Sequence, residues 1–205
     1  MTIIKQYKYG VGLALVTLWL LMTVYAFWWF QFRLLQPFTT AGQQSTVLFD
    51  SDPLRDQLSA ISRQTSGSAD NITVVHFWDP DCPCNRFNEA HVKQLMQEYG
   101  RQGVRFVVVA GSQIKTAKRI FTDPAVIEYI EELPSLSRPP SSPAVAIMDK
   151  KGELAYFGPY SVGAVCSVGN GAFVEKALDK VLSGINPKHW NTLAVGCFCS
   201  WPAMG

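Results

Sequence analysis

The sequence lacks a strong charge of either sign, and this excludes one large class of partners. Lysine and arginine number 18 and aspartate and glutamate 16, which leaves a net charge of +2. Without Lys5, Lys8 and Arg33, which flank an apolar N-terminal segment, 15 basic residues remain against 16 acidic ones, a net charge of −1. Nucleic-acid-binding domains are usually strongly basic, with clustered lysine and arginine. We therefore expect no nucleic-acid partner.

The chain also lacks internal repeats, long low-complexity tracts and any nucleotide-binding motif. The missing repeats argue against a solenoid or an array of small modules. The missing nucleotide motif means that no bound cofactor is expected, so electrons for any redox reaction would come from a partner protein. A length of 205 residues suits one ordinary domain with additional segments.

Charge is absent altogether from residues 10–30, near the N-terminus. At the helical rise these 21 residues span roughly 31 Å, about the hydrocarbon thickness of a bilayer. The run ends in Phe27-Trp28-Trp29-Phe30, which is typical of an aromatic belt at a membrane interface. A cleaved signal peptide is the competing interpretation, but no small-x-small cleavage site follows closely. We expect a transmembrane helix at 10–32.

The flanking charges predict the orientation of this helix. Lys5 and Lys8 precede the span and only Arg33 closely follows it, so the positive-inside rule places residues 1–9 in the cytoplasm. The expected protein is a single-pass protein of the inner (cell) membrane, whose linker at 33–46 leads to an extracytoplasmic domain. In a bacterium that side is the periplasm. Five cysteines outside the membrane suit an oxidising compartment, and their odd number leaves at least one unpaired within the chain.

Two cysteines separated by one proline follow a predicted strand. Residues 72–78 are a short β-branched and aromatic run that ends at Asp79-Pro80. After Cys82-Pro83-Cys84, apolar residues recur at three- and four-residue spacing, which predicts a helix from about Cys84 to Gly100. The cysteines therefore lie at a helix N-terminus, where free N–H groups and the helix dipole lower the pKa of a thiol.

These residues resemble the thioredoxin-like family, whose signature is a strand ending in Phe-Trp followed by Cys-x-x-Cys on a helix N-terminus. Phe77-Trp78 and Cys82 match that layout, but only Pro83 separates the two cysteines, and His76 stands where thioredoxins carry a buried acid. The resemblance covers roughly 47–184. It implies an α/β fold, a mixed sheet flanked by helices, here preceded by one N-terminal transmembrane helix.

The remaining periodicities fit this fold. We expect helices at 54–61, at 114–133 with an interruption at Asp123-Pro124, and at 172–182, and strands at 104–109, 144–148 and 153–157. The last two strands form a hairpin around a glycine-containing turn. In the thioredoxin-like family a cis-proline precedes this hairpin and faces the active cysteines, and Pro143 is the matching residue.

Histidine is scarce, and only one of the three histidines has two competing interpretations. His76 is either a neutral core histidine or a proton acceptor for the cysteines, and the sequence favours neither. His91 lies on the apolar helix face and is expected to pack. His189, in the tail, belongs to no recognisable constellation, and Trp78 is expected to pack beneath the active site.

Thiol–disulfide exchange is the predicted function, as an oxidoreductase or isomerase acting on protein thiols or disulfides in the periplasm. Cys82 would attack, Cys84 would resolve the mixed disulfide, Pro143 would shape the substrate groove and His76 would relay a proton. A copper-handling protein is the first alternative, because the thiolates of Cys82 and Cys84 are soft ligands that suit Cu(I). A non-catalytic interaction domain is the second.

The tail, 185–205, carries a second Cys-x-Cys, Cys197-Phe198-Cys199. The resemblance implies that the loop containing Cys166 lies beside the active cysteines. We expect the apolar tail residues Leu193, Val195, Phe198 and Trp201 to dock on the domain. A structural disulfide from Cys166 to Cys197 or Cys199 is the favoured arrangement. A relay in which the tail pair exchanges disulfides with Cys82 and Cys84 is second, and a zinc ion held by all four Cys-x-Cys thiols is third.

Overall fold

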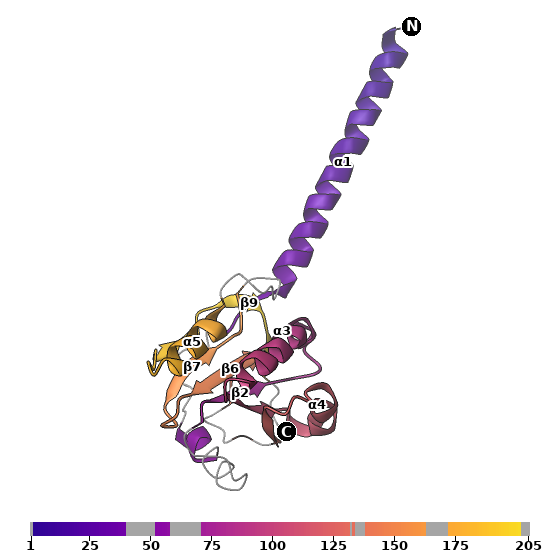
Figure 1. Ribbon diagram of the computed structural model, residues 1–205. Coiled ribbons are helices and arrows are strands. Elements are labelled where there is room, and N and C mark those ends of the chain that lie inside the picture. Colours follow the sequence, from indigo (N-terminus) through magenta and orange to yellow (C-terminus); the bar gives the residue numbers. More distant parts are fainter. Residues whose placement is uncertain are drawn as a thin grey trace. The chain divides into compact units, whose positions relative to one another are not determined.

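A computed structural model describes residues 2–39, 52–57, 71–131, 133, 138–162 and 172–201. The chain forms two compact units, Met1–Leu35 and Gln36–Gly205. The first is helix α1 (Thr2–Leu34), drawn in indigo and violet in Figure 1. Its segment Tyr9–Trp29 is long and apolar enough to cross a membrane, a property that a signal sequence near the N-terminus shares.

The second unit is an α/β domain with a mixed sheet flanked by helices, as predicted. Its elements are, in chain order, β1 (Leu35–Pro37), β2 (Thr73–Phe77), α3 (Pro83–Gly100), β3 (Arg105–Val109), η1 (Gly111–Gln113), α4 (Ile114–Ile120), β4 (Val126–Ile130), β5 (Ser141–Ser142), β6 (Ala144–Met148), β7 (Leu154–Gly158), α5 (Phe173–Leu182), β8 (His189–Trp190), β9 (Val195–Cys197) and β10 (Cys199–Ser200). A further helical stretch covers 52–57.

Six strands form the main sheet, in the order β4-β3-β2-β6-β7-β8. Strand β2 is parallel to β3 and antiparallel to β6. Both neighbours satisfy the backbone of β2, and its residues after Thr73 are buried. Side chains alternate between two faces along a strand, so Val74 enters one core cluster while Val75 and Phe77 enter the other. The strand that precedes the cysteines is thus held on both edges and both faces.

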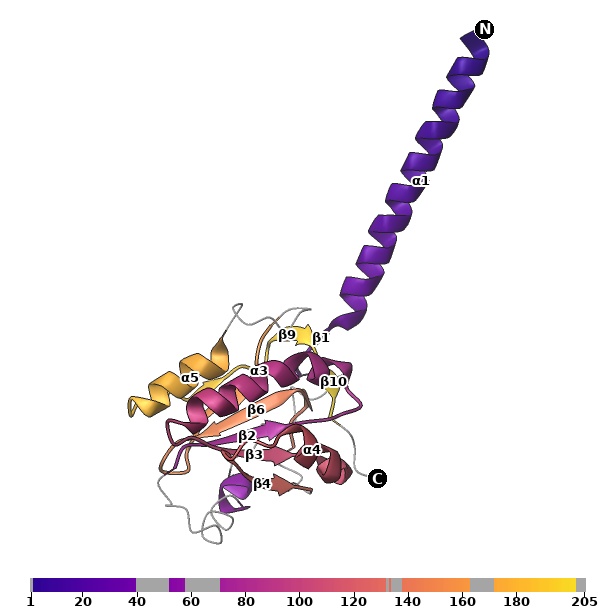
Figure 2. The same cartoon turned by 45° about the vertical axis from the view of Figure 1, so that its right-hand side comes forward.

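Helices α3 and α5 cover the same face of the sheet, as Figure 2 shows. Their apolar residues, Val92, Leu95 and Met96 from α3 and Leu178 and Val181 from α5, share one core cluster with the sheet. The opposite face is covered by Phe38, by Leu54 of the helical stretch at 52–57, and by tail residues that include Phe198. The tail is therefore part of the core of the domain.

The sequence prediction was wrong for the second half of the helix expected at 114–133. Helix α4 ends at Ile120, and β4 pairs parallel with β3 after Asp123-Pro124. Proline stops a helix, and the residues beyond it contact both core clusters: Val126 and Tyr129 pack on one and Ile127 on the other. The pairing of β4 with β3 shifts register between Phe106 and Val107, so the strand lacks a regular two-residue alternation, and its three-residue spacing is easily mistaken for a helical period.

The segment predicted as a linker, 33–46, also differs in its described part. Strand β1 pairs with β9, and Phe38 is fully buried, with its N–H group donating to the carbonyl oxygen of Ala194 at 2.8 Å. Phe38 packs edge-on against Phe157 and Phe198. An aromatic residue in a short polar stretch gave no periodic signal, because only the distant tail provides its partner.

The junction between α3 and β4 leaves no room for a side chain at Gly100. A Cβ atom there would lie 2.6 Å from the Cβ atom of Ala125. We expect Gly100→Ala to lower the free energy of unfolding by about 1–3 kcal/mol, as overpacking does, although alanine is the better helix former. Urea denaturation of the full chain in detergent measures this change in the free energy of unfolding. In a background that carries Ala125→Gly, the Gly100→Ala substitution should lower the stability by less than it does in the wild type. If Gly100→Ala left the wild-type stability unchanged or raised it, the packing described would be contradicted.

Candidate functional site

The Cys-Pro-Cys segment lies at the amino end of α3, as predicted. Cys82 is the N-cap residue and Pro83 occupies the first turn, where a missing N–H group costs nothing. The side chain of Cys82 makes no capping hydrogen bond. Both cysteines therefore lie at the positive end of the helix dipole, a position that would stabilise a thiolate on either of them.

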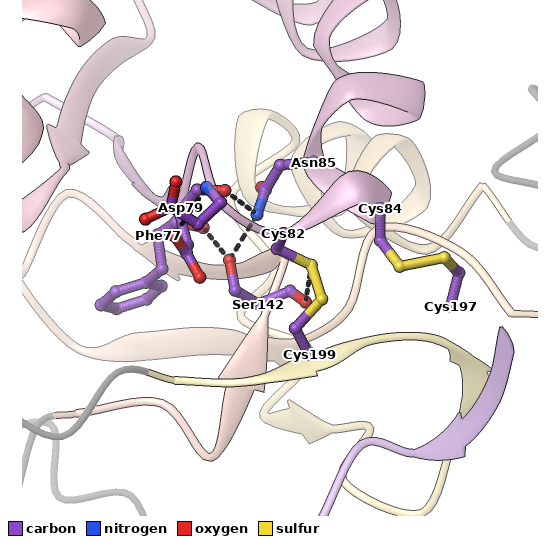
Figure 3. The surroundings of a disulfide bond; sticks show 9 residues. Phe77, Asp79, Cys82, Cys84, Asn85, Ser142, Cys197 and Cys199 are labelled. Carbon is purple, nitrogen blue, oxygen red and sulfur yellow. Dashed lines mark hydrogen bonds between the residues drawn. A yellow bond between two sulfur atoms is a disulfide. The ribbon is translucent and has the colours of Figure 1, made fainter. Parts of the chain in front are cut away.

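Both cysteines are bonded to the tail, as Figure 3 shows. Cys82 forms a disulfide with Cys199, with Sγ atoms 2.06 Å apart, across 117 residues of sequence. Cys84 forms a disulfide with Cys197, with Sγ atoms 2.03 Å apart, across 113 residues. Cys82, Cys84 and Cys197 are buried, whereas Cys199 is half-buried. Four of the five cysteines thus form one cluster.

This pairing corrects the favoured prediction for the tail. The expected disulfide from Cys166 to Cys197 or Cys199 is not formed, because both tail cysteines are bonded to the Cys-Pro-Cys segment. Cys166 itself lies outside the described residues. Cys82 and Cys84 are likewise not bonded to each other. The observed links are those that the relay hypothesis requires, and the relay as an activity stays a proposal.

Backbone pairing brings the tail to the cysteines. Strand β10 runs antiparallel to β5 with Cys199 opposite Ser142, and the N–H group of Trp201 donates to the carbonyl oxygen of Pro140 at 3.2 Å. Phe198 is buried and the ring of Trp201 packs edge-on against Phe77. Docking of these two residues is confirmed.

The docking predicted for the other two apolar tail residues was wrong. Leu193 is 78% exposed and Val195 is 51% exposed. Val195 belongs to β9, whose pairing with β1 uses its backbone and leaves the side chain outside. Hydropathy alone could not show that Leu193 and Val195 are exposed while Phe198 is buried, since the direction of each side chain depends on the strand with which its own strand pairs.

Three segments meet at Ser142 and Asn85, beside the Cys82–Cys199 disulfide (Figure 3). The Nδ2 group of Asn85 donates to the carbonyl oxygen of Asp79 at 2.8 Å and to Oγ of Ser142 at 2.7 Å. The hydroxyl group of Ser142 donates to the carbonyl oxygen of Phe77 at 3.3 Å. These bonds join the end of β2, the first turn of α3 and β5. The next peptide bond, Ser142–Pro143, is cis, which confirms the prediction for Pro143.

The carbonyl oxygen of Ser142 lies 3.6 Å from Sγ of Cys82. A disulfide sulfur carries no proton, so this contact is not a hydrogen bond in the oxidised protein. After reduction, the thiol of Cys82 could donate its proton to that carbonyl group. The carbonyl group therefore favours the thiol, while the helix N-terminus favours the thiolate, and both act on the same sulfur.

A carboxyl group also lies in this region. Burial raises the pKa of Asp79, while the backbone N–H group of Asp81, which donates to Oδ1 of Asp79 at 3.0 Å, partly opposes the shift. The carbonyl oxygen of Asp79 in turn accepts the N–H group of Cys82 at 3.2 Å. Asp79 therefore stands one turn before Cys82 as a group that can hold a proton more readily than an exposed aspartate.

His76 is fully enclosed and bonded to a tyrosine rather than to a cysteine. Its Nδ1 atom and the hydroxyl group of Tyr160 are 2.8 Å apart, and its ring packs edge-on against Phe121 and Tyr160. Burial lowers the pKa of His76 to about 3, with the backbone of Ala144 acting in the opposite direction. An imidazole with so low a pKa is a weak base at neutral pH, which favours the packing interpretation over the proton acceptor.

The other two histidines lie away from the sulfur atoms. His91 is buried, as expected, and its Nε2 atom is 2.6 Å from Oε1 of Glu175 on α5. Burial alone would raise the pKa of Glu175, but the hydrogen bond with His91, a backbone hydrogen bond and the charges of His91 and Lys176 together outweigh it, so the pKa is lowered. His189 stacks on Tyr156 at the edge of the sheet. Trp78 is buried against Phe121, as expected for a packing residue.

Sequence reasoning missed three residues of this region: Asn85, Ser142 and Tyr160. An asparagine in the first turn of a helix ordinarily faces water, and no local pattern marks Asn85 as a buried donor. Ser142 precedes Pro143 in a proline- and serine-rich stretch, and no local pattern marks it as part of a buried hydrogen-bond network. Tyr160 lies in a loop after the hairpin, so its contact with His76 across 84 residues had no sequence signal.

A metal ion could be held only by the reduced form. The Sγ atoms of Cys82, Cys84 and Cys199 lie within 4.8 Å of one another, the one such grouping among the described residues. Thiolates suit Zn²⁺ and Cu(I), so the donor set fits either ion once the disulfides are opened. Cys197 lies next in the same cluster through its bond to Cys84.

Comparison with known families gives one match. Residues 52–201 match the family model described as "Domain of unknown function (DUF6436)". The chain belongs to this family. The match spans the Cys-Pro-Cys segment and the tail cysteines together, so both pairs lie within the family domain. No curated protein matches the sequence.

Solved structures resemble the domain in fold. An uncharacterized conserved protein from Geobacillus kaustophilus is 21% identical, with a TM-score of 0.52, and the match covers 66% of this chain and 80% of that one. A hypothetical protein from Sinorhizobium meliloti 1021 is 16% identical, with a TM-score of 0.55 and coverage of 72% and 85%. A thiol:disulfide interchange protein of the thioredoxin family from Chlorobium tepidum TLS matches at 15% identity, with coverage of 59% and 84% and a TM-score of 0.42. The first two matches show that the domain shares its α/β fold with these solved structures.

Asn85 and Asn88 offer a matched test of the polar contacts. Both are fully buried on α3, but neither amide atom of Asn88 has a hydrogen-bond partner in the described part of the chain. We expect Asn85→Ala to lower the free energy of unfolding by about 1–3 kcal/mol more than Asn88→Ala, because it removes the donor to Oγ of Ser142 and one of the two donors to the carbonyl oxygen of Asp79. Urea denaturation of the oxidised protein measures both, and equal losses would contradict the role assigned to Asn85.

The burial of His76 predicts a pH dependence of stability. Below its ordinary pKa of 6.5 the unfolded chain protonates His76, whereas the folded chain does so only near pH 3. The unfolded state then binds more protons, so this group lowers the free energy of unfolding as the pH falls between those values. His76→Gln should lose less stability than the wild type between pH 7 and pH 4. The control is His189→Gln, which removes an exposed imidazole, and parallel curves for wild type and His76→Gln would contradict the burial.

Proposed function

We propose that this protein is a membrane-tethered thiol–disulfide oxidoreductase or isomerase whose domain works on the extracytoplasmic side, in a bacterium the periplasm. The observation that carries the proposal is the double link between Cys82-Pro83-Cys84 at the amino end of α3 and Cys197-Phe198-Cys199, beside cis-Pro143. A disulfide relay requires several sulfur atoms in one place, so that each sulfur can bond to one partner and then exchange it for another.

The roles follow from position. In the reduced protein Cys82 is the attacking thiolate, because it caps α3 and the helix dipole favours its ionised form. Sγ of Cys84 and Sγ of Cys199 both lie within 4.8 Å of it. Either sulfur is within reach of a mixed disulfide between Cys82 and a substrate, and Cys199 is the favoured resolving cysteine, because resolution by Cys84 would close a ring around Pro83 alone. Pro143 and Ser142 border the attacking sulfur and shape the surface on which the substrate lies.

The tether is supported by composition. The segment Tyr9–Trp29 has the length and apolar character of a membrane span, and the charges at Lys5 and Lys8 favour a cytoplasmic N-terminus. Disulfides persist in oxidising compartments, which agrees with a domain outside the cytoplasm. Its partners would be protein thiols or disulfides and a redox partner protein.

One observation favours a second function. Three Sγ atoms within 4.8 Å of one another, from Cys82, Cys84 and Cys199, would give a soft three-thiolate site for Cu(I) in the reduced protein. Under this alternative the disulfides are the resting state of an empty copper carrier. Tight Cu(I) binding by the reduced protein together with no catalysis of disulfide exchange would favour it over the oxidoreductase.

The decisive experiment is turnover of a disulfide substrate. Full-length protein in detergent is expected to accelerate reduction of insulin disulfides by dithiothreitol or refolding of a scrambled disulfide protein. Cys82→Ala should lower the rate at least about 100-fold, because it removes the nucleophile of a covalent mechanism. The control is Lys93→Ala, an exposed residue on the same helix, which should keep the wild-type rate. A wild type as slow as Cys82→Ala with every substrate would overturn the proposal.

A further inference from the structure

We propose that Cys199 is the sulfur at which a reducing partner attacks the oxidised protein, and that Cys199 then passes the reduction to the buried Cys84–Cys197 disulfide. The inference rests on the proposed function and adds an order of events to it. The reducing partner is a protein or small molecule with two neighbouring thiols.

Accessibility selects the first sulfur. Cys82 is 1% exposed, Cys84 3% and Cys197 2%, whereas Cys199 is half-buried in the short strand β10 near the end of the tail. An incoming thiolate must reach a sulfur along the line of the bond that breaks, so access decides which sulfur is attacked. The Cys84–Cys197 disulfide has two buried sulfurs and no such approach.

The leaving group supports the same choice. Attack on Cys199 breaks its bond to Cys82, and Cys82 leaves as a thiolate at the N-cap of α3. A more stable thiolate is the better leaving group, and the position of Cys82 at the N-cap of α3 favours its thiolate. Attack on Cys82 would instead expel Cys199, which belongs to β10 and whose sulfur lies one bond farther from the amino end of α3.

The first two steps transfer one electron pair. A partner thiolate bonds to Sγ of Cys199 and releases the Cys82 thiolate, which takes up a proton. The second partner thiolate then attacks the partner's own sulfur in this mixed disulfide, and the Cys199 thiolate leaves. The partner dithiol has become a disulfide and has lost two electrons, while Cys82 and Cys199 have gained them.

The third step moves the remaining disulfide without further redox change. The Cys199 thiolate attacks Sγ of Cys84, which lies within 4.8 Å, so a Cys84–Cys199 bond forms and Cys197 leaves as a thiolate. Attack by Cys82 is disfavoured, because only Pro83 would separate the bonded cysteines and disulfide geometry is hard to meet in so small a ring. The new disulfide contains the accessible Cys199, and a second dithiol reduces it by the same route.

Mapping of a trapped intermediate tests the first step. The oxidised full-length protein in detergent is treated briefly with reduced glutathione, quenched with acid, blocked with N-ethylmaleimide and analysed by peptide mass spectrometry. We expect glutathione on Cys199 and maleimide on Cys82. Glutathione on Cys82 with maleimide on Cys199, or first attachment to Cys84 or Cys197, would overturn the inference. This experiment uses the wild type and does not depend on a variant folding.

Two matched variants test the internal exchange. In Cys82→Ser the free Cys199 can still attack Cys84, so dithiothreitol should reduce the Cys84–Cys197 disulfide about as fast as in the wild type. In Cys199→Ser the attacking sulfur is lost, and that reduction should be at least about tenfold slower, since buried sulfurs exchange slowly. Equal rates in the two variants, both folded by circular dichroism, would overturn the inference.

The two proposals fail differently. If the wild type exchanges disulfides with substrates but glutathione attaches first elsewhere, the proposed function stands and the order of events is wrong. If the wild type has no exchange activity, the proposed function fails and the order of events fails with it.

Discussion

The pairing of β10 with β5 is the contact on which the cysteine cluster depends. It involves two residues on each strand, with Cys199 opposite Ser142. So short a ladder is weak alone, but Trp201 and Phe198 pack on the core at its two ends, and β9 pairs with β1 just before it. The tail is thereby fixed across the amino end of α3, which brings Cys199 to Cys82 and Cys197 to Cys84.

The sheet provides the rigid support for that contact. Strand β2 lies between β3 and β6, and both of its faces are buried. The turn that follows Phe77 therefore starts from a strand that is held in place on all sides. Asn85 and Ser142 then tie this turn to α3 and β5 through one hydrogen-bond network. Buried hydrogen bonds of this kind restrict the geometry of the segments that they join. The sulfur atoms consequently meet with little freedom, which suits exchange among a small set of partners.

A tail that occupies the cysteines has a consequence for chemistry. Under the proposed function, an incoming substrate would meet a segment that is paired with β5 and bonded to Cys82, so opening of the Cys82–Cys199 disulfide would be linked to access to the surface beside Pro143. The oxidised protein and the protein able to attack a substrate therefore differ in covalent structure and in access to the same surface. Under the proposed function, the Cys82–Cys199 disulfide has to open before Cys82 can attack a substrate.

Local patterns anticipated the elements whose partners lie close in sequence. Residues 72–78 read as a buried strand, residues 84–100 as a helix and residues 144–157 as a hairpin, and the structure has β2, α3, β6 and β7 at nearly those bounds. The error at 114–133 arose because β4 is short and its identity depends on pairing with β3. Phe38 and Val195 were misjudged for a related reason, since each is placed by a strand partner far along the chain.

The sequence by itself determined the apolar N-terminal helix, the α/β pattern, the position of Cys82 and Cys84 at a helix N-terminus and the proline before the hairpin. Each follows from hydrophobic periodicity or from conformational limits of a few neighbouring residues. Only the tertiary structure decided which cysteines bond, where the tail lies, and that His76 is enclosed beside Tyr160. The physical reason is distance along the chain: disulfide partners 117 and 113 residues apart are brought together by packing and strand pairing that no local pattern encodes.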